Sequence, residues 1–233
     1  MGAHWRFRGH IAGLGTAEGT RLVVGHWPTS PFGPFSDVMV ERPDGLRILL
    51  APDQRVTDFV AATYRFDEVR LVPVRVRRSA AGWRVEAGPL ELEIGSGPRA
   101  PLGRLLRMVP GPVAESLTWA RLVAPVAALV LPGVRTTGSA GGGRVEWYGA
   151  RDVHRITGAR ARWDGRDLGG LRPVEPPTRF GFSSTPATPS VVTVTTTVQL
   201  PPASAGPRAR APHRSARPAR PRSPAAAGAD PGR

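Results

Sequence analysis

The feature that most constrains the fold of this chain is an alternation of apolar residues at every second position, which recurs through its first 200 residues. Alternation of this kind places apolar side chains on one face of a β-strand, as Trp5, Phe7 and Ile11 illustrate. The pattern predicts about ten strands. Runs that carry it include residues 21–27, 36–42, 46–52, 71–77, 83–94, 145–156, 178–184 and 190–200.

The segments between these runs have the chemistry of tight turns. Asp44-Gly45 and Asp164-Gly165 are pairs that adopt the backbone conformations of short hairpin loops, so a hairpin is predicted at each. Gly88-Pro89 interrupts an alternating run, and we expect a β-bulge there.

Helix signals are fewer. Residues 56–63 place apolar side chains on one helical face and predict a short helix. Residues 112–131 predict a second helix, kinked or split at Pro125 and buried against a sheet. Its apolar run is about half the length that spans a bilayer, and contact with a membrane surface is the alternative.

Together these patterns predict a mainly β (α+β) protein. We expect an antiparallel β-barrel or a strongly curved sheet, with one or two covering helices, over residues 1–200. This architecture resembles that of the lipocalins and the acetoacetate decarboxylases. Barrels of this type often hold small apolar or amphipathic ligands.

Residues 201–233 differ sharply in composition from the rest of the chain. They hold ten Ala, eight Pro and seven Arg, and they show no apolar periodicity, so we expect a disordered tail. The tail is either a basic segment that binds nucleic acid or another acidic surface, or the product of a frameshift in a GC-rich gene. All 32 basic residues are Arg, which codon bias explains without nucleic-acid binding elsewhere in the chain.

The missing residue types exclude several chemistries. The chain has no Lys, so it cannot form the Schiff base of a pyridoxal-phosphate enzyme or of a decarboxylase, nor a Walker-type phosphate loop. It has no Cys, which fits a soluble cytoplasmic protein and excludes Cys-ligated zinc. No cofactor, metal site or transmembrane span is predicted, and nothing in the sequence indicates an oligomeric state.

Residues 145–156, VEWYGARDVHRI, hold the densest group of chemically capable side chains. As two strands joined by a turn at Gly149-Ala150, they would place Glu146 with Tyr148 on one face, and Asp152 with His154 on one face. We predict a ligand site formed by Trp147, Tyr148, Asp152 and His154. Alternatively, Trp147 and its apolar neighbours only complete the core.

Two further arrangements are open. One is a site of His26 with Asp37 and Glu41, which would share a strand face with each other. The other is a triad of His154 with Asp152 or Asp167 and a serine, Ser183 or Ser184.

The leading functional prediction is the binding of a small, partly apolar molecule in a barrel-like cavity. The first alternative is an enzyme that uses His154 and nearby carboxylates for acid–base chemistry, because histidine titrates near neutral pH. The second is binding of nucleic acid or an acidic surface through the arginines of residues 201–233.

Overall fold

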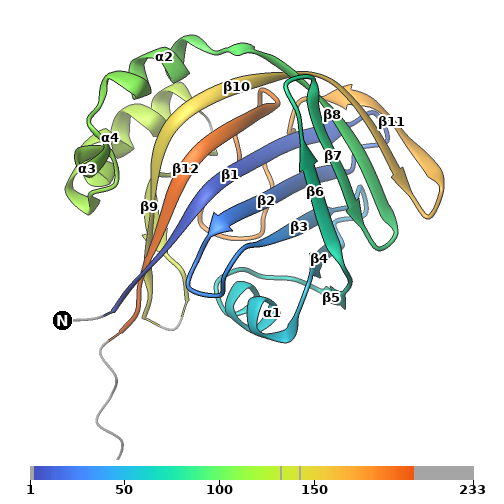
Figure 1. Cartoon of the computed structure of the whole chain (residues 1–233), viewed down its shortest axis with the longest axis horizontal. Coiled ribbons are helices and arrows are strands. Elements are labelled where there is room, and N and C mark those ends of the chain that lie inside the picture. The colour runs from blue at the N-terminus through green and yellow to red at the C-terminus, as the bar shows by residue number, and fades with distance from the viewer. Residues whose placement is uncertain (1–2, 132, 142, 202–233) are drawn as a thin grey trace, which may run out of the picture. The chain divides into compact units, whose positions relative to one another are not determined.

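The computed structural model describes residues 3–131, 133–141 and 143–201, which form twelve strands and four helices (Figure 1). The strands are β1 (His4–Thr16), β2 (Arg21–Thr29), β3 (Phe35–Glu41), β4 (Arg47–Ala51), β5 (Glu68–Leu71), β6 (Val74–Arg78), β7 (Gly82–Ala87), β8 (Leu90–Arg99), β9 (Thr137–Ser139), β10 (Val145–Trp163), β11 (Arg166–Arg172) and β12 (Ser190–Gln199). The helices are α1 (Gln54–Ala61), α2 (Pro101–Met108), α3 (Gly111–Ala114) and α4 (Leu117–Val130).

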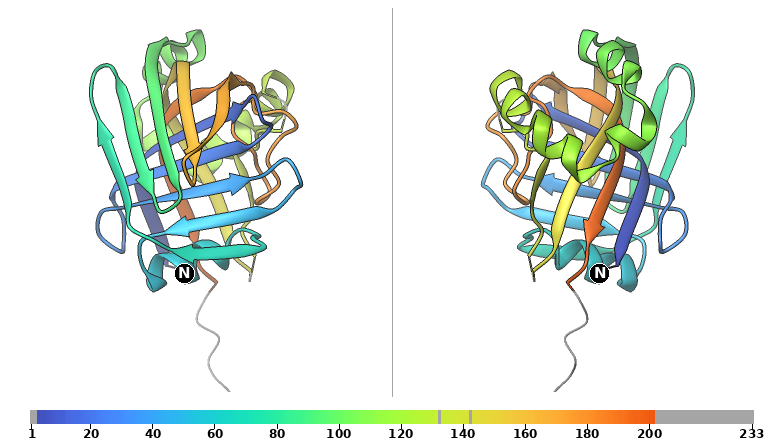
Figure 2. Two further views of the ribbon diagram at one scale, coloured as in Figure 1. Left: turned by 90° about the vertical axis from the view of Figure 1, so that its right-hand side faces the viewer. Right: turned by 90° about the vertical axis from the view of Figure 1, so that its left-hand side faces the viewer.

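All twelve strands belong to one strongly curved sheet, which confirms the predicted fold class. The hydrogen-bonded order is β5-β4-β3-β2-β1-β11-β10-β8-β7-β6, and β12 lies between β1 and β10 for most of their length. Every pairing is antiparallel except that of β4 with β5. The curvature brings β6, β7 and β8 across one face of β1–β4 (Figures 1 and 2). This path ends at β5 and β6, so the sheet is curved and not a closed barrel.

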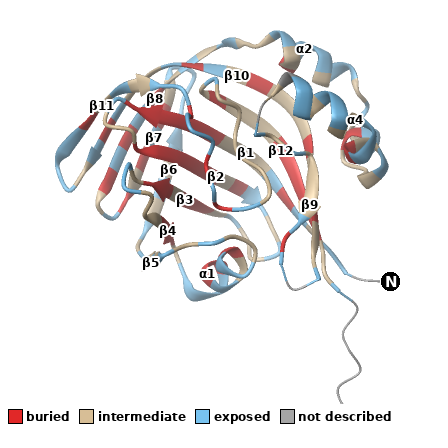
Figure 3. Cartoon of the chain, turned by 180° about the vertical axis from the view of Figure 1, so that it is seen from behind, coloured by how far each residue is buried: buried red, intermediate tan, exposed pale blue. Residues whose placement is uncertain are grey.

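We call the face of β1–β4 that meets β7 and β8 the front face, and the opposite one the back face. The front face holds the main apolar core, in which Leu14, Val24 and Val38 pack against Val85 and Leu92. The back face carries a second, aromatic cluster that includes Phe7 and Trp27, with Phe59 of α1 packed against it. Both faces are therefore covered, as the buried bands on β1–β3 in Figure 3 show.

The two predicted hairpins are confirmed. β3 and β4 pair around Asp44-Gly45, and β10 and β11 pair around Asp164-Gly165, where both turn residues have positive φ angles (49° and 77°). Gly88-Pro89 is also a hairpin turn, because Ala87 pairs directly with Leu90. The predicted bulge there is wrong: the run of residues 83–94 folds back on itself.

The helices differ from the prediction in number and in burial. The helix expected at residues 56–63 is confirmed as α1, whereas α2 was not predicted. The helix expected at residues 112–131 is split between α3 and α4, with the break before Ser116 and with Pro125 inside α4. Its predicted burial is wrong, because α4 rests on the sheet along one side only and exposes Leu122, Val126 and Leu129.

Residues 178–184 do not form the predicted strand. Two of their backbone N–H groups bond to side chains, because Thr178 donates to Ser184 Oγ and Arg179 donates to Glu41 Oε2. The Ser184 N–H donates to the carbonyl oxygen of Gly133. The segment that joins β11 to β12 therefore crosses the back face, where Phe180 is buried (Figure 3). Glu41 also pairs with Arg21 and with the Arg179 guanidinium, and so ties this segment to β3.

The predicted tail, residues 201–233, lies outside the described residues apart from Pro201. In the described part of the chain, no helix combines the length and the apolar character that crossing a membrane requires.

Candidate functional site

The predicted site on β10 is divided by a β-bulge. No turn occurs at Gly149-Ala150; the strand continues, with a shift in its pairing to β12 between Ala150 and Asp152. Tyr148 pairs with Thr196 and Val153 pairs with Val192, and these two β12 residues lie on the same face because four positions separate them. Tyr148 and Val153 therefore also share a face, although five positions separate them on β10. The bulge thus places Tyr148 on the back face and Asp152 on the opposite face.

The other three predicted residues lie on the opposite side of β10, beneath the helices. The Trp147 indole donates to the carbonyl oxygen of Glu115 at 2.9 Å. Asp152 Oδ2 lies 3.6 Å from His154 Nε2, so the predicted neighbourhood of these two side chains is confirmed. Asp152 also accepts two hydrogen bonds from the Arg99 Nε at 2.9 and 3.0 Å. This ion pair joins β8 to β10 and occupies both oxygens of the carboxylate.

On the back face, Tyr148 belongs to a partly buried chain of hydrogen bonds. The Tyr64 hydroxyl donates to Glu146 Oε1 at 2.7 Å and lies 3.0 Å from the Tyr148 hydroxyl. The ring of Tyr148 stacks on Phe182 of the segment that joins β11 to β12, with ring centroids 5.6 Å apart. We call Tyr64, Glu146 and Tyr148 the tyrosine–glutamate cluster.

Glu146 has an unusual environment for a carboxyl group. The residue is 1% exposed, and its Oε2 has no hydrogen-bond partner among the described residues. Burial raises the pKa of Glu146 to about 7, although hydrogen bonds from the two tyrosines oppose this change. Burial and the nearby carboxyl group raise the pKa of both tyrosines well above 10. The cluster therefore holds a proton that can be exchanged near neutral pH.

The structure separates the proposed group of His26, Asp37 and Glu41. His26 pairs with Ser36 and hydrogen-bonds its hydroxyl on the front face, whereas Asp37 lies on the back face. There Asp37 accepts a hydrogen bond from the Trp27 indole at 3.0 Å, and burial raises its pKa to about 6. Asp37 and Glu41 do share a face, as expected.

The proposed triad is not assembled either. His154 Nδ1 lies 3.2 Å from the Gly97 carbonyl oxygen. The Ser184 hydroxyl accepts a hydrogen bond from the Thr178 amide, and the Ser183 hydroxyl accepts one from the amide of Arg135, which lies between α4 and β9. Asp167 accepts from the amide of Gly169 in the β11 strand.

A second histidine environment lies on the front face beside the core. His10 pairs with His26 across β1 and β2, and Arg78 lies 3.2 Å from His10 Nδ1 with its guanidinium over the Trp83 ring. Burial, and then the positive charge of Arg78, lower the pKa of His10 to about 4. Burial and Arg78 also lower the pKa of His26, so both histidines are neutral at pH 7.

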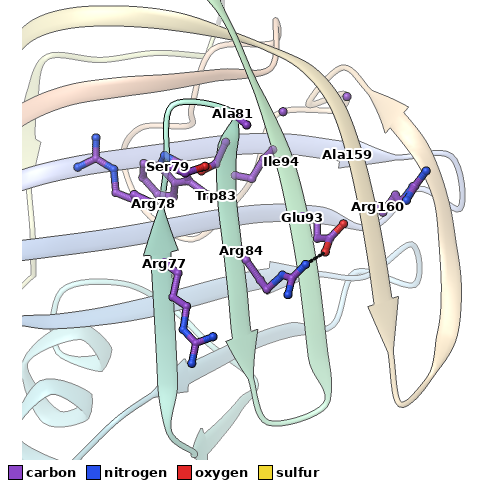
Figure 4. Close-up of a pocket in the computed structure, with 13 residues that line it drawn as sticks. Arg77, Arg78, Ser79, Ala81, Trp83, Arg84, Glu93, Ile94, Ala159 and Arg160 are labelled. Carbon is purple, nitrogen blue, oxygen red and sulfur yellow. Dashed lines mark hydrogen bonds and ion pairs between the residues drawn. The ribbon is translucent and has the colours of Figure 1, made fainter.

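A groove lies on the outer surface of β6, β7, β8 and β10, with a volume of about 640 Å³ (Figure 4). Its floor is a row of three glycines, because Gly82 pairs with Gly95 and Gly95 with Gly158. A Cβ atom at Gly158 would meet no atom within 4 Å, so this part of the floor is open. We call this feature the glycine-floored groove.

A row of charged side chains borders the glycine floor. Arg77 pairs with Arg84, and Glu93 pairs with both Arg84 and Arg160. These residues lie two positions from the glycines along β7, β8 and β10, and so project from the same face. Only Glu93 is acidic, and it accepts a hydrogen bond from Arg84 at 2.7 Å. The row therefore keeps a net positive charge.

No pattern in the sequence predicted this groove. Its signal is a glycine two positions before an arginine, as in Gly82-Trp83-Arg84 and Gly158-Ala159-Arg160. Neither Gly–X–Arg sequence indicates a site by itself, and the two sequences lie 76 positions apart, measured from glycine to glycine. Only the register of β7, β8 and β10 aligns them.

Within residues 3–131, 133–141 and 143–201, no group of three or more His, Asp or Glu side chains could hold a metal ion.

Comparisons with known proteins add little. No protein-family model matches the chain, and no curated protein matches it. Among solved structures, it is similar to acetoacetate decarboxylase from Legionella pneumophila subsp. pneumophila str. Philadelphia 1, with 9% identity, a TM-score of 0.40 and 85% of each chain covered. A likeness this weak supports no argument about function.

Proposed function

We propose that this protein binds a small molecule with an anionic group and a flat, partly apolar body in the glycine-floored groove. The observation that carries the proposal is the alignment of three glycines beside three arginines on adjacent strands. The volume of about 640 Å³ is in the range of small-molecule sites.

The two rows suit different parts of such a ligand. A floor without side chains lets a planar group lie close to the peptide backbone of β7, β8 and β10. Arginine guanidinium groups bind carboxylate, sulfonate or phosphate oxygens through paired N–H donors. Because Glu93 is bonded to Arg84, Arg77 and Arg160 supply the charge without an acidic partner in the row.

A fluorescent probe with this chemistry tests the proposal. Anilinonaphthalene sulfonate joins a sulfonate to flat aromatic rings and brightens when it leaves water. We expect saturable binding to the full chain. Gly158→Leu should weaken it at least about tenfold, because the new side chain fills the open floor without a clash. Arg160→Gln should weaken it about fivefold, the effect of one exposed charge contact of ~1 kcal/mol.

Ala61→Leu is the matched control. Ala61 is an exposed residue of α1, no residue of which lines the groove, and the substitution introduces the same apolar side chain. This variant should bind the probe like the parent chain. Equal affinity of the parent, Gly158→Leu and Arg160→Gln chains would overturn the proposal, and so would equal weakening by Gly158→Leu and Ala61→Leu.

The other predictions from the sequence are not replaced by this one. Ligand binding at Tyr148, acid–base chemistry at His154 and nucleic-acid binding by residues 201–233 stay predictions. So do a cytoplasmic location and a single domain over residues 1–200.

A further inference from the structure

The three helices that follow β8 concentrate the exposed apolar surface of the molecule. Six of the eight large apolar side chains exposed in the described chain belong to α2, α3 and α4. They are Leu105, Met108, Val113, Leu122, Val126 and Leu129. These helices lie together on the outer side of β10 (Figures 1 and 2).

On α4 the exposed residues form a continuous stripe. Leu122, Pro125, Val126 and Leu129 follow the spacing of one helical face, and all are exposed. Leu129 is 83% exposed and Leu122 69%. We call these four residues the α4 stripe. An apolar helical face turned to solvent is the reverse of the usual arrangement.

The opposite side of α4 contacts β9 and β10 and is bonded to the segment before β9. Ala120 is fully buried, and its carbonyl oxygen accepts a hydrogen bond from Thr136 at 2.6 Å. Ser116 caps the first turn by accepting from the Trp119 amide. The stripe is therefore presented outward by an anchored helix.

The charged residues of α2 and α4 all have one sign. They are Arg104, Arg107 and Arg121, of which Arg107 lies 3.7 Å from Asp152 of β10. Within residues 100–144 the one acid is Glu115, whose side chain is 17% exposed and pairs with Arg8. Pairing with a second copy of this surface would bring arginines together without acidic partners. A bilayer surface with anionic headgroups complements both the arginines and the apolar stripe.

We propose that α2 and α4 dock this protein on an anionic phospholipid surface, with the α4 stripe in the acyl boundary and Arg104, Arg107 and Arg121 at the headgroups. The helices would lie along the surface and not cross it. This proposal is independent of the glycine-floored groove, which no residue of these helices lines.

Co-sedimentation of the full chain with lipid vesicles tests the proposal. We expect binding to vesicles of equal parts phosphatidylglycerol and phosphatidylcholine, and much weaker binding to phosphatidylcholine alone. Leu122→Asp and Leu129→Asp should each lower the partition coefficient about tenfold, because each removes one buried leucine. Arg104→Gln should lower it about fivefold on the anionic vesicles only.

Leu71→Asp is the control, because Leu71 is 54% exposed on β5, away from these helices, and the charge change is identical. It should bind like the parent chain. Thermal melts should show that all four variants fold. The proposal is wrong if Leu71→Asp loses as much binding as Leu129→Asp, since general charge would then hold the chain on the vesicle. It is also wrong if Leu122→Asp and Leu129→Asp bind like the parent, or if they only convert a dimer to a monomer.

Discussion

Glu146 shows how one residue can be held in a protonation state that water would not favour. The fold places its carboxyl group almost entirely out of solvent and gives one oxygen a tyrosine donor, while the other oxygen has no partner in the described structure. Removing the carboxylate charge from water costs more free energy than one hydrogen bond to it contributes. The proton therefore stays on the carboxyl group up to about pH 7.

This arrangement predicts a pH-dependent stability. The pKa of Glu146 rises from 4.5 to about 7 on folding, so between these values the unfolded chain has released a proton that the folded chain keeps. The stability from this group is full below about pH 4.5 and is lost as the pH rises to about 7, by roughly 3 kcal/mol. Denaturant melts of Glu146→Gln should lack this pH dependence. The free energy of unfolding of the variant should therefore increase relative to that of the parent chain as the pH rises.

The matched control at this site is Thr196→Val. Thr196 lies opposite Tyr148 in the sheet, and its hydroxyl has no partner among the described residues. Since this substitution changes no titrating group, its effect on the free energy of unfolding should be the same at every pH. A constant difference between Glu146→Gln and the parent chain from pH 4.5 to 7 would contradict the assignment.

At the scale of elements, α4 combines poor helix chemistry with exposure. Pro125 has no N–H to donate to the carbonyl oxygen of Arg121, and its ring crowds the preceding turn. The helix is nevertheless formed, because Ser116 caps its start and Ala120 packs on the sheet. Tertiary contacts thus offset an unfavourable local sequence.

Replacing this proline should therefore stabilise α4 itself. Pro125→Ala restores the missing hydrogen bond in an exposed position, for a local gain of roughly 1–3 kcal/mol. Amide hydrogen exchange in residues 117–130 should slow accordingly. Pro101→Ala, at the first turn of α2 where a proline loses no helical hydrogen bond, should leave exchange in α2 nearly unchanged. Equal effects at both prolines would show that Pro125 is not strained.

At the scale of the whole molecule, the long strands of the sheet pair with different neighbouring strands along their length. β10 pairs with β12 in its first half and with β8 and β11 in its second. The bulge near Asp152 lets the strand follow this curvature. The same strand therefore contributes Glu146 to the back face and Gly158 to the glycine-floored groove.

The pairing of β12 predicts where the chain can be shortened. β12 pairs with β1 from Ser190 to Gln199, and the Leu200 amide still donates to Ala3. Ending the chain after Pro201 should leave the melting temperature and probe binding unchanged. Ending it after Thr193 should prevent folding, because six of the ten residues of β12 would be lost. If the first truncation also unfolds the protein, residues 202–233 contribute to the fold.

The same truncation separates the two hypotheses for the tail. A functional basic tail should give the full chain a salt-sensitive affinity for nucleic acid that the truncated chain lacks. A frameshifted tail predicts no such difference, and predicts another ending in a different reading frame of the gene.

The sequence by itself determined the features that depend on neighbouring residues. Alternation placed Glu146 and Tyr148 on one face, and Asp164-Gly165 adopts the conformation that its hairpin needs. These features are local because side-chain direction follows the backbone and turn type follows the pair of residues in the turn.

Only the tertiary structure decided the features that depend on distant partners. The bulge that parts Tyr148 from Asp152 arises from pairing with β12, and the amides of Thr178 and Arg179 bond to Ser184 and Glu41 instead of to a strand. The glycine-floored groove needs three strands in register, and the exposure of Leu129 depends on what the rest of the chain leaves uncovered. Strand register and burial are set by segments far apart in the sequence, so no local pattern can specify them.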